Sequence, residues 1–310
     1  MSNGDNHPRA IEHWVPVAGR WEFAGNTARF LGPLRAEDPP AGIALSGIRL
    51  RDGSVSAKVK FAGSAPGPGT AGVILGYHGQ ESGYVVAGLG AHDAAYGISE
   101  YDPTLGWRLL VGRGSVQNLS VGQWYSIEVI QRGQEITMSD SGVTVFRHVL
   151  TRPLIGNQLG VFGWGKGPVE FSEVVGVETR PRLFVAMQFS EPFDTLYQRV
   201  IQPKATAAGF EVVRIDEVMR PGIIFEDIKR EISQSKAVIA EISAPNNNVF
   251  YELGYAHALN KPTILLAQRG KELPFDIRSY RVVFYDDTIG GKVQLEETLE
   301  KHLHAVLHDV

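Results

Sequence analysis

Apolar and polar residues alternate in short segments through the first half of the chain, from Trp14 to about Val177. Alternation with a period of two is typical of strands that bury one face, and Gly, Pro, Asp and Asn stand between the segments. No segment in this half has a helical period. The pattern predicts an all-β sandwich. The expected strands are 55–61, 71–77, 84–89, 96–101, 107–112, 124–130, 135–140, 143–149, 159–164 and 169–177, with a hairpin turn at Ser141-Gly142.

The second half alternates between buried strands and amphipathic helices. The run 183–187 is continuously apolar, as in a strand buried on both faces. Ile224, Ile228 and Ile232 recur at a spacing of four, as on the buried face of a helix. This alternation predicts a five-stranded parallel sheet with helices on both faces. The expected strands are 183–187, 210–215, 236–242, 262–267 and 280–285; the expected helices are one ending near Ala208, then 223–235, about 249–260 and about 292–307.

The chain length and the change of pattern predict two domains. A single hydrophobic core rarely serves 310 residues. The expected division is an N-terminal tail at 1–13, a β-sandwich at 14–179 and an α/β domain at 182–310. The short polar segment Arg180-Pro181-Arg182 marks the junction.

Composition and charge exclude several functions. The net charge is −4, from 30 Lys and Arg against 34 Asp and Glu, so there is no electrostatic case for binding nucleic acid or an anionic membrane. The absence of cysteine excludes disulfides, thiolate chemistry and Cys-based zinc sites. No apolar run reaches the length of a membrane span, and the N-terminus has no signal-peptide pattern. We therefore expect a cytoplasmic protein.

The sandwich half offers acidic and aromatic residues for a sugar site. A glycosidase needs two carboxylates that face one sugar, and aromatic rings can stack on sugars. The commoner alternatives are solvated loop charges and aromatic side chains that fill the core. The acidic candidates are Glu81, Asp93, Glu100 and Asp102, and the aromatic candidates are Trp14, Trp21, Trp107, Trp124 and Trp164.

The α/β half offers polar residues where its strands end. In open parallel sheets, ligands bind beyond the carboxyl ends of the strands. Capping of the following helix is an alternative role for Asn248, and the core is an alternative place for the aromatic side chains. The chain has no glycine-rich phosphate loop, no nucleophile elbow and no metal-ligand spacing. The candidate substrate-binding residues are Gln188, Phe189, Ser190, Asp216, Ser243, Asn248 and Tyr251, and no metal is expected.

Glu252 is the candidate catalytic residue. It stands between Tyr251 and Leu253 in an otherwise apolar helix. A carboxylate at such a position must point into a cavity, find a partner or shift its pKa. The plainer alternative is a carboxylate in the first helical turn that the helix dipole favours.

Four segments of the first half resemble the concanavalin/laminin-G-like jelly rolls. Some members of that group bind sugars and some hydrolyse them. The resemblance implies a module for binding or self-association, with a sugar or a protein as the ligand. The segments are GYVVAGL (83–89), GWRLLVG (106–112), VGQWYSIEVIQRGQEITMSDSGVTVF (121–146) and IGNQLGVFGWGKGPVEFSEVVGV (155–177).

Three segments of the second half resemble the TIR / nucleoside 2-deoxyribosyltransferase superfamily. They are LFVAMQFSEPFD (183–194), the run from VVRIDEVMRPG to NNNVFYELGYAHALNKPTILL (212–266) and LPFDIRSYRVVFY (273–285). The resemblance implies a flavodoxin-like, TIR-like sheet and the cleavage of an N-glycosidic bond, with Glu252 at the position of the catalytic glutamate. A carboxylate there would stabilise the positive charge that builds on the ribose as the bond breaks.

The same resemblance implies a substrate and an assembly. The expected activity is that of an NAD glycohydrolase (NADase) that releases nicotinamide and functions in antiphage (antiviral) defence. No cofactor is implied, because NAD is the substrate. Homo-oligomers would form through the TIR-like domain, and the sandwich would be a sensor or an oligomerisation module. Phe189 or Tyr251 would stack on the base, and Arg214, Arg220 or Lys236 would meet phosphates.

Two alternatives stay open at this point. One is a 2-deoxyribosyltransferase or hydrolase of nucleosides or nucleotides. The other is a module without catalysis that binds a nucleotide or docks through TIR–TIR contacts. The third strand ends in Glu241-Ile242-Ser243, and the first loop lacks the glycine-rich form of the transferases. Both departures favour the TIR-like hydrolase.

Overall fold

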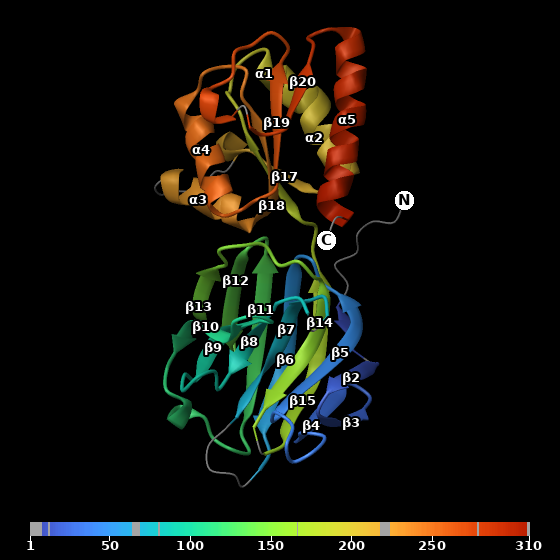
Figure 1. The fold of residues 1–310 in the computed structure, drawn as a ribbon, viewed down its shortest axis with the longest axis vertical. Coiled ribbons are helices and arrows are strands. Elements are labelled where there is room, and N and C mark those ends of the chain that lie inside the picture. Colours follow the sequence, from blue (N-terminus) through green and yellow to red (C-terminus); the bar gives the residue numbers. More distant parts are fainter. Residues whose placement is uncertain are drawn as a thin grey trace. The chain divides into compact units, whose positions relative to one another are not determined.

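The computed structural model describes residues 8–11, 13–63, 69–79, 81–165, 167–217, 224–277 and 279–308. The chain forms two compact units (Figure 1). The first comprises Met1–Gln131, Ile136–His148 and Leu154–Thr179, and the second comprises Arg132–Glu135, Val149–Pro153 and Arg180–Val310. Within the described ranges, fifteen strands lie in two large sheets of the first unit and five lie in the sheet of the second.

One sheet of the first unit has eight strands. Its order is β13-β12-β11-β6-β15-β4-β3, and β1 pairs with β15 off this path. β6 shows why these residues form strands: Val55, Ala57 and Val59 are buried, whereas the serines and lysines between them are half-buried. The bounds are β1 Arg9–Ala10, β3 Arg20–Ala24, β4 Thr27–Gly32, β6 Gly53–Phe61, β11 Trp124–Arg132, β12 Glu135–Asp140, β13 Val143–Val149 and β15 Val169–Glu178.

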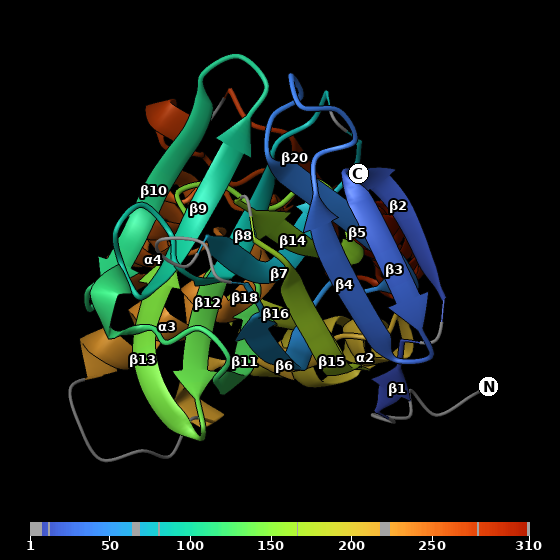
Figure 2. The same ribbon diagram turned by 90° about the horizontal axis from the view of Figure 1, so that it is seen from below.

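The other sheet of the first unit has seven strands, in the order β10-β9-β8-β7-β14-β5-β2. Figure 2 shows the two sheets as two layers. Every residue of β8 is buried, so this strand is covered on both faces: Val85 and Ala87 point to one face, and Tyr84 and Val86 to the other. The bounds are β2 Trp14–Ala18, β5 Ala41–Arg49, β7 Thr70–Tyr77, β8 Tyr84–Leu89, β9 Tyr96–Asp102, β10 Gly106–Arg113 and β14 Gln158–Trp164, with a short 3-10 turn η1 at Val116–Asn118.

The predicted antiparallel sandwich is confirmed. Neighbouring strands of both sheets pair antiparallel, and each segment expected from residue 55 onward is a strand. The turn between β12 and β13 is the expected one, because Ser141 and Gly142 both have positive φ, at 49° and 80°. A two-residue hairpin turn of this handedness matches the twist of the strands it joins. The sequence pattern missed β1 to β5, which precede residue 55.

The second unit contains five parallel strands in the order β17-β16-β18-β19-β20. Leu183 and Val185 of β16 pack on one face with helices that include α5, and Phe184 packs on the other with α3 and α4 (Figure 1). The strands are β16 Arg182–Ala186, β17 Glu211–Val213, β18 Ser235–Glu241, β19 Thr263–Gln268 and β20 Val282–Tyr285. The helices are α1 Phe193–Leu196, the π-helical turn η2 Tyr197–Ile201, α2 Gln202–Ala207, α3 Ile224–Gln234, α4 Asn247–Ala258 and α5 Ile289–His308, with 3-10 turns η3 Ile215–Glu217 and η4 Phe275–Ile277.

The predicted fold class needs correction. Three quarters of the strands belong to the two large antiparallel sheets, so the chain as a whole is mainly antiparallel β and jelly-roll-like. The flavodoxin-like, TIR-like part of the predicted fold class is therefore wrong.

The start of α4 differs from the expected one. The side chain of Asn246 accepts a hydrogen bond from the backbone N–H of Asn248, at 3.0 Å. Asn246 is therefore the N-cap, and Asn248 lies within the first turn. The expectation that Asn248 caps this helix is wrong by two residues, because any of three consecutive asparagines can supply the capping oxygen.

Candidate functional site

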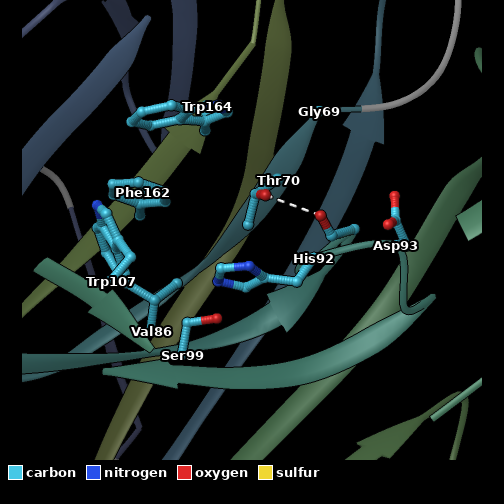
Figure 3. A pocket seen from close by; sticks show the side chains of 10 residues that line it. Gly69, Thr70, Val86, His92, Asp93, Ser99, Trp107, Phe162 and Trp164 are labelled. Carbon is cyan, nitrogen blue, oxygen red and sulfur yellow. Dashed lines mark hydrogen bonds between the residues drawn. The ribbon is translucent and has the colours of Figure 1, made fainter. Parts of the chain in front are cut away.

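One candidate site is a cavity of about 410 Å³ on the face of the seven-stranded sheet that carries Tyr84 and Val86. Its size is within the usual range of ligand pockets, about 300–1,000 Å³. Figure 3 shows aromatic side chains along one side of the cavity, polar side chains opposite them and Ser99 with Val86 at its base. The lining residues are Gly69, Thr70, Val86, Gly90, His92, Asp93, Ser99, Trp107, Phe162 and Trp164.

The aromatic side of the cavity consists of Trp107, Phe162 and Trp164. The rings of Trp107 and Phe162 lie 5.0 Å apart, and those of Phe162 and Trp164 lie 6.5 Å apart and nearly parallel. Phe162 and Trp164 are two residues apart on β14, so they share a face of the sheet. Tyr84 and Tyr101 pack against Trp107 from behind, at 5.7 and 5.4 Å. This support holds Trp107 in place while part of its ring lines the cavity.

Ser99 forms a polar point at the base of the cavity. It lies on β9, where it shares a face with Tyr101, and its side chain is 4% exposed. Its hydroxyl group has no hydrogen-bond partner among the described residues. Buried polar groups are nearly always satisfied, so an orphan hydroxyl in a cavity indicates a group that bonds to a ligand or to solvent.

The loop between β8 and β9 presents His92 and Asp93 to the cavity. Both residues have left-handed backbone conformations, with φ of 46° and 64°. Non-glycine residues rarely adopt them, and they cluster at functional sites. The loop is held by a hydrogen bond from Val116 N to Asp93 O at 2.8 Å and by one from Thr70 Oγ1 to Gly90 O at 2.8 Å, which is the dashed line in Figure 3. A Cβ on Gly90 would lie 2.0 Å from the carbonyl oxygen of Gly69, so only glycine fits there.

Of the four acidic candidates, only Asp93 lines the cavity. Glu100 lies one residue from Ser99, on the opposite face of β9, and pairs with Arg108 at 2.5 Å. Asp102 accepts hydrogen bonds from the backbone N–H groups of Thr104 and Leu105, so it stabilises a turn. The commoner alternative, a solvated loop charge, is wrong for Glu100, which lies within β9 with 13% of its side chain exposed.

The five tryptophans also divide into those that line the cavity and those that do not. Trp107 and Trp164 line the cavity. Trp14 and Trp21 both stack against Phe23, away from the cavity-lining set, and Trp124 is 42% exposed beneath the ammonium group of Lys60. The sequence pattern did not single out Ser99, His92, Thr70 or Phe162. A signal for Ser99 existed, since it is the one small polar residue within the strand YGISEY.

In the second unit, Glu252 is buried in α4 with 4% of its surface exposed. Burial raises the pKa of its carboxyl group to about 7. No hydrogen-bond or ion-pair partner of this carboxyl group lies in the described ranges. Glu252 thus meets the chemical requirement of an acid–base group near neutral pH, and its catalytic role stays a prediction.

The residues expected around Glu252 make contacts within the protein. Asp216 accepts two hydrogen bonds from Arg214, at 2.7 and 2.6 Å, and Arg214 also donates to Asp194 at 2.7 Å. Gln188 donates to Ser190 at 2.7 Å. The donors of Arg214 are thereby engaged, which argues against its predicted contact with a phosphate.

Ser243 is engaged as well. Its hydroxyl group donates to Glu241 and accepts from the backbone N–H of Gln268 at 2.6 Å, and the Tyr285 hydroxyl donates to Glu241 at 3.0 Å. Burial raises the pKa of Glu241, and these hydrogen bonds oppose that rise.

The aromatic candidates of this unit lie at its surface. Phe189 is 46% exposed and lies 5.2 Å from the guanidinium of Arg214, and Tyr251 is 45% exposed and packs against Phe225. The Arg220-Pro221-Gly222 loop lies outside the described residues. The substrate-binding roles of Gln188, Phe189, Ser190, Asp216, Ser243, Asn248 and Tyr251 stay predictions.

No helix among the described residues is both long and apolar enough to cross a membrane. No group of three or more His, Asp or Glu side chains in the same ranges could hold a metal ion.

The solved structures that are similar to this protein match about half of its chain. The carbohydrate-binding module CBM66 from Bacillus subtilis is 13% identical, with a TM-score of 0.45, and the match covers 53% of this chain and 94% of that one. The Bacillus licheniformis β-glucanase is 10% identical, with a TM-score of 0.41 and coverage of 56% and 98%. A prokaryotic β-1,3-1,4-glucanase (lichenase) derived from a mouse hindgut metagenome is 11% identical, with a TM-score of 0.40 and the same coverage. No protein-family model and no curated protein matches the chain.

These findings correct the family assignment of the second half. The similar structures are jelly-roll proteins and give no support for a TIR or deoxyribosyltransferase-like half. Identities this low, with TM-scores below 0.5, say nothing about the ligand of this chain.

The predicted function and partners are corrected as well. The matched proteins are a carbohydrate-binding module and glycoside hydrolases, so the prediction of an NAD glycohydrolase in antiphage defence has no support, and neither has NAD as a partner. The internal contacts of Arg214 point the same way. The predicted self-association through a TIR-like domain loses its basis together with that assignment.

Proposed function

We propose that the first unit binds a carbohydrate in the cavity of the seven-stranded sheet. The observation that carries the proposal is the combination of an aromatic side, formed by Trp107, Phe162 and Trp164, with the orphan hydroxyl of Ser99 at the base. Sugars have apolar faces that stack on aromatic rings and a rim of hydroxyl groups that need hydrogen-bond partners. Apolar lining with a few convergent polar groups is the general form of a small-molecule site.

Binding without hydrolysis is favoured by the number of carboxylates. Glycoside hydrolysis uses two carboxyl groups, about 5 to 9.5 Å apart, on either side of the scissile bond. Asp93 is the only acidic residue among the described residues that line the cavity.

Trp107→Ala tests the aromatic side of the cavity. Loss of the stacking surface should weaken binding by roughly ten- to a hundredfold, equivalent to about 1.4–2.8 kcal/mol. Isothermal titration calorimetry with neutral oligosaccharides found by a glycan microarray measures the change. Trp124→Ala is the matched control, because Trp124 is an exposed tryptophan on the other sheet. Equal losses of affinity in the two variants would contradict the role of Trp107 in binding. A wild-type protein that binds no glycan would overturn the proposal.

The Ser99→Ala variant tests whether the Ser99 hydroxyl contributes to ligand binding or to the stability of the first unit. Removing an unsatisfied buried hydroxyl should leave the free energy of unfolding unchanged or raise it by up to about 1 kcal/mol. Affinity for the same oligosaccharide should fall roughly fivefold, because about 1 kcal/mol of hydrogen bonding is lost. Urea unfolding and calorimetry give the two values, with Ser126→Ala on the exposed side of β11 as the control. Lower stability together with unchanged affinity would mean that Ser99 is structural.

A further inference from the structure

The charge of the cavity distinguishes among sugars. Among the described residues that line the cavity, Asp93 is the one acidic residue. The others are aromatic, aliphatic, glycine or hydroxyl-bearing residues and the imidazole-bearing His92, and none is a lysine or an arginine. A negatively charged ligand group would thus meet a carboxylate and no lysine or arginine within that set.

Backbone hydrogen bonds hold the loop that carries this carboxylate. Asp93 and the preceding His92 have positive φ, and the carbonyl oxygen of Asp93 accepts a hydrogen bond from Val116 at 2.8 Å. A second hydrogen bond, from Ala94 N to Ala91 O at 2.9 Å, closes the loop around the two residues. Figure 3 shows Asp93 on the side of the cavity opposite the tryptophans. A sugar stacked on Trp107 or Trp164 would therefore turn its other side toward this charge.

We propose that the cavity selects uncharged sugar residues and that Asp93 excludes acidic ones, such as uronates. This inference rests on the proposed carbohydrate binding and adds its substrate class. Like charges a few ångströms apart repel, and salt screens this repulsion because Asp93 is exposed. Asp93 is thus a specificity-determining residue, which discriminates against carboxylates.

Matched polymer pairs test the proposal. Neutral glucan, galactan and mannan oligosaccharides are compared with polyglucuronate, polygalacturonate and polymannuronate oligosaccharides of the same linkage and length, in which a carboxylate replaces the C6 alcohol. The full-length protein should bind at least one neutral member at least about tenfold more tightly than its acidic counterpart at pH 8 and low salt. The preference should shrink as NaCl rises from 0.05 to 0.5 M, because salt screens charge but does not relieve a steric clash.

Two variants assign the effect to a residue. Asp93→Asn should bring affinity for the acidic member to within about threefold of affinity for the neutral one. Glu81→Gln, which removes an exposed carboxylate of the same unit that does not line the cavity, should leave the preference as in the wild type.

The outcomes separate this inference from the proposed function. Equal or tighter binding of an acidic member by the wild type overturns charge selection and leaves carbohydrate binding intact. A preference that survives both Asp93→Asn and high salt overturns the role of Asp93, because the exclusion is then steric. Absence of binding to every neutral and acidic member overturns the proposed function itself.

Discussion

Arg214→Met is expected to lower the free energy of unfolding of the second unit by about 3 kcal/mol, toward the lower end of the range for breaking buried ion pairs. Arg214 is 6% exposed and donates to both Asp194 and Asp216, so its loss leaves two carboxylates without their partner. We expect a loss near the lower end of this range because the side chains of Asp194 and Asp216 are 30% and 31% exposed, so both carboxylates can be solvated in the variant. The guanidinium also lies 4.3 Å from the centre of the Tyr197 ring, a contact that methionine cannot reproduce.

Urea unfolding followed by circular dichroism at 222 nm measures this effect, because the α-helices of the described chain lie in the second unit. Arg269→Met is the matched control. Its partner is Asp286 at 3.3 Å, both side chains are exposed, and the expected change is within about 1 kcal/mol. A loss in Arg214→Met no larger than that of the control would show that the buried guanidinium contributes no more than a surface ion pair.

Glu252→Gln is expected to stabilise the second unit at alkaline pH and to have little effect at acidic pH. Burial raises the pKa of Glu252 to about 7, from 4.5 for an ordinary glutamate. Between these values the folded state keeps a proton that the unfolded state has lost, so the free energy of unfolding falls as pH rises through this window. Above pH 7 the cost is complete and amounts to about 3 kcal/mol, since each pKa unit corresponds to about 1.4 kcal/mol. A glutamine is neutral at every pH and avoids this cost.

The measurement is the urea unfolding free energy of wild type and Glu252→Gln at pH 4 and pH 8. The difference between the two proteins should be near zero at pH 4 and rise to as much as about 3 kcal/mol in favour of the variant at pH 8. Glu272→Gln, which changes an exposed carboxylate in the loop after β19, should show no such pH dependence. A variant that is less stable at pH 8 would mean that the Glu252 carboxylate has a stabilising partner.

The positions of the strands could be predicted from the local sequence pattern, whereas the position of the candidate site could not. The period-two alternation of 55–61 and 84–89 marks β6 and β8 without reference to any other part of the chain. The five earlier strands were missed because they are short or interrupted by residues such as Pro16, Gly42 and Gly47, which weaken the alternation.

The cavity depends on pairing that no local pattern contains. β14 pairs with β7, about 85 residues earlier in the chain, and this pairing brings Trp164 opposite Thr70. Sequence reasoning named both Trp107 and Trp164 among five tryptophans, but it had no means to separate them from Trp14, Trp21 and Trp124. Glu252 was recognisable as a problem within its own helix, because a carboxylate in an apolar run needs an explanation whatever the fold.

The aromatic side of the cavity also has an optical consequence. All five tryptophans of the chain precede residue 165, so ultraviolet emission excited at 295 nm reports on the first unit and not on the second. Trp107 and Trp164 are the two that line the cavity, and a molecule that displaces water from their rings should shift their emission toward shorter wavelengths. Tryptophan emission thus reports ligand binding in the cavity without an added label. The second unit must be followed by other signals.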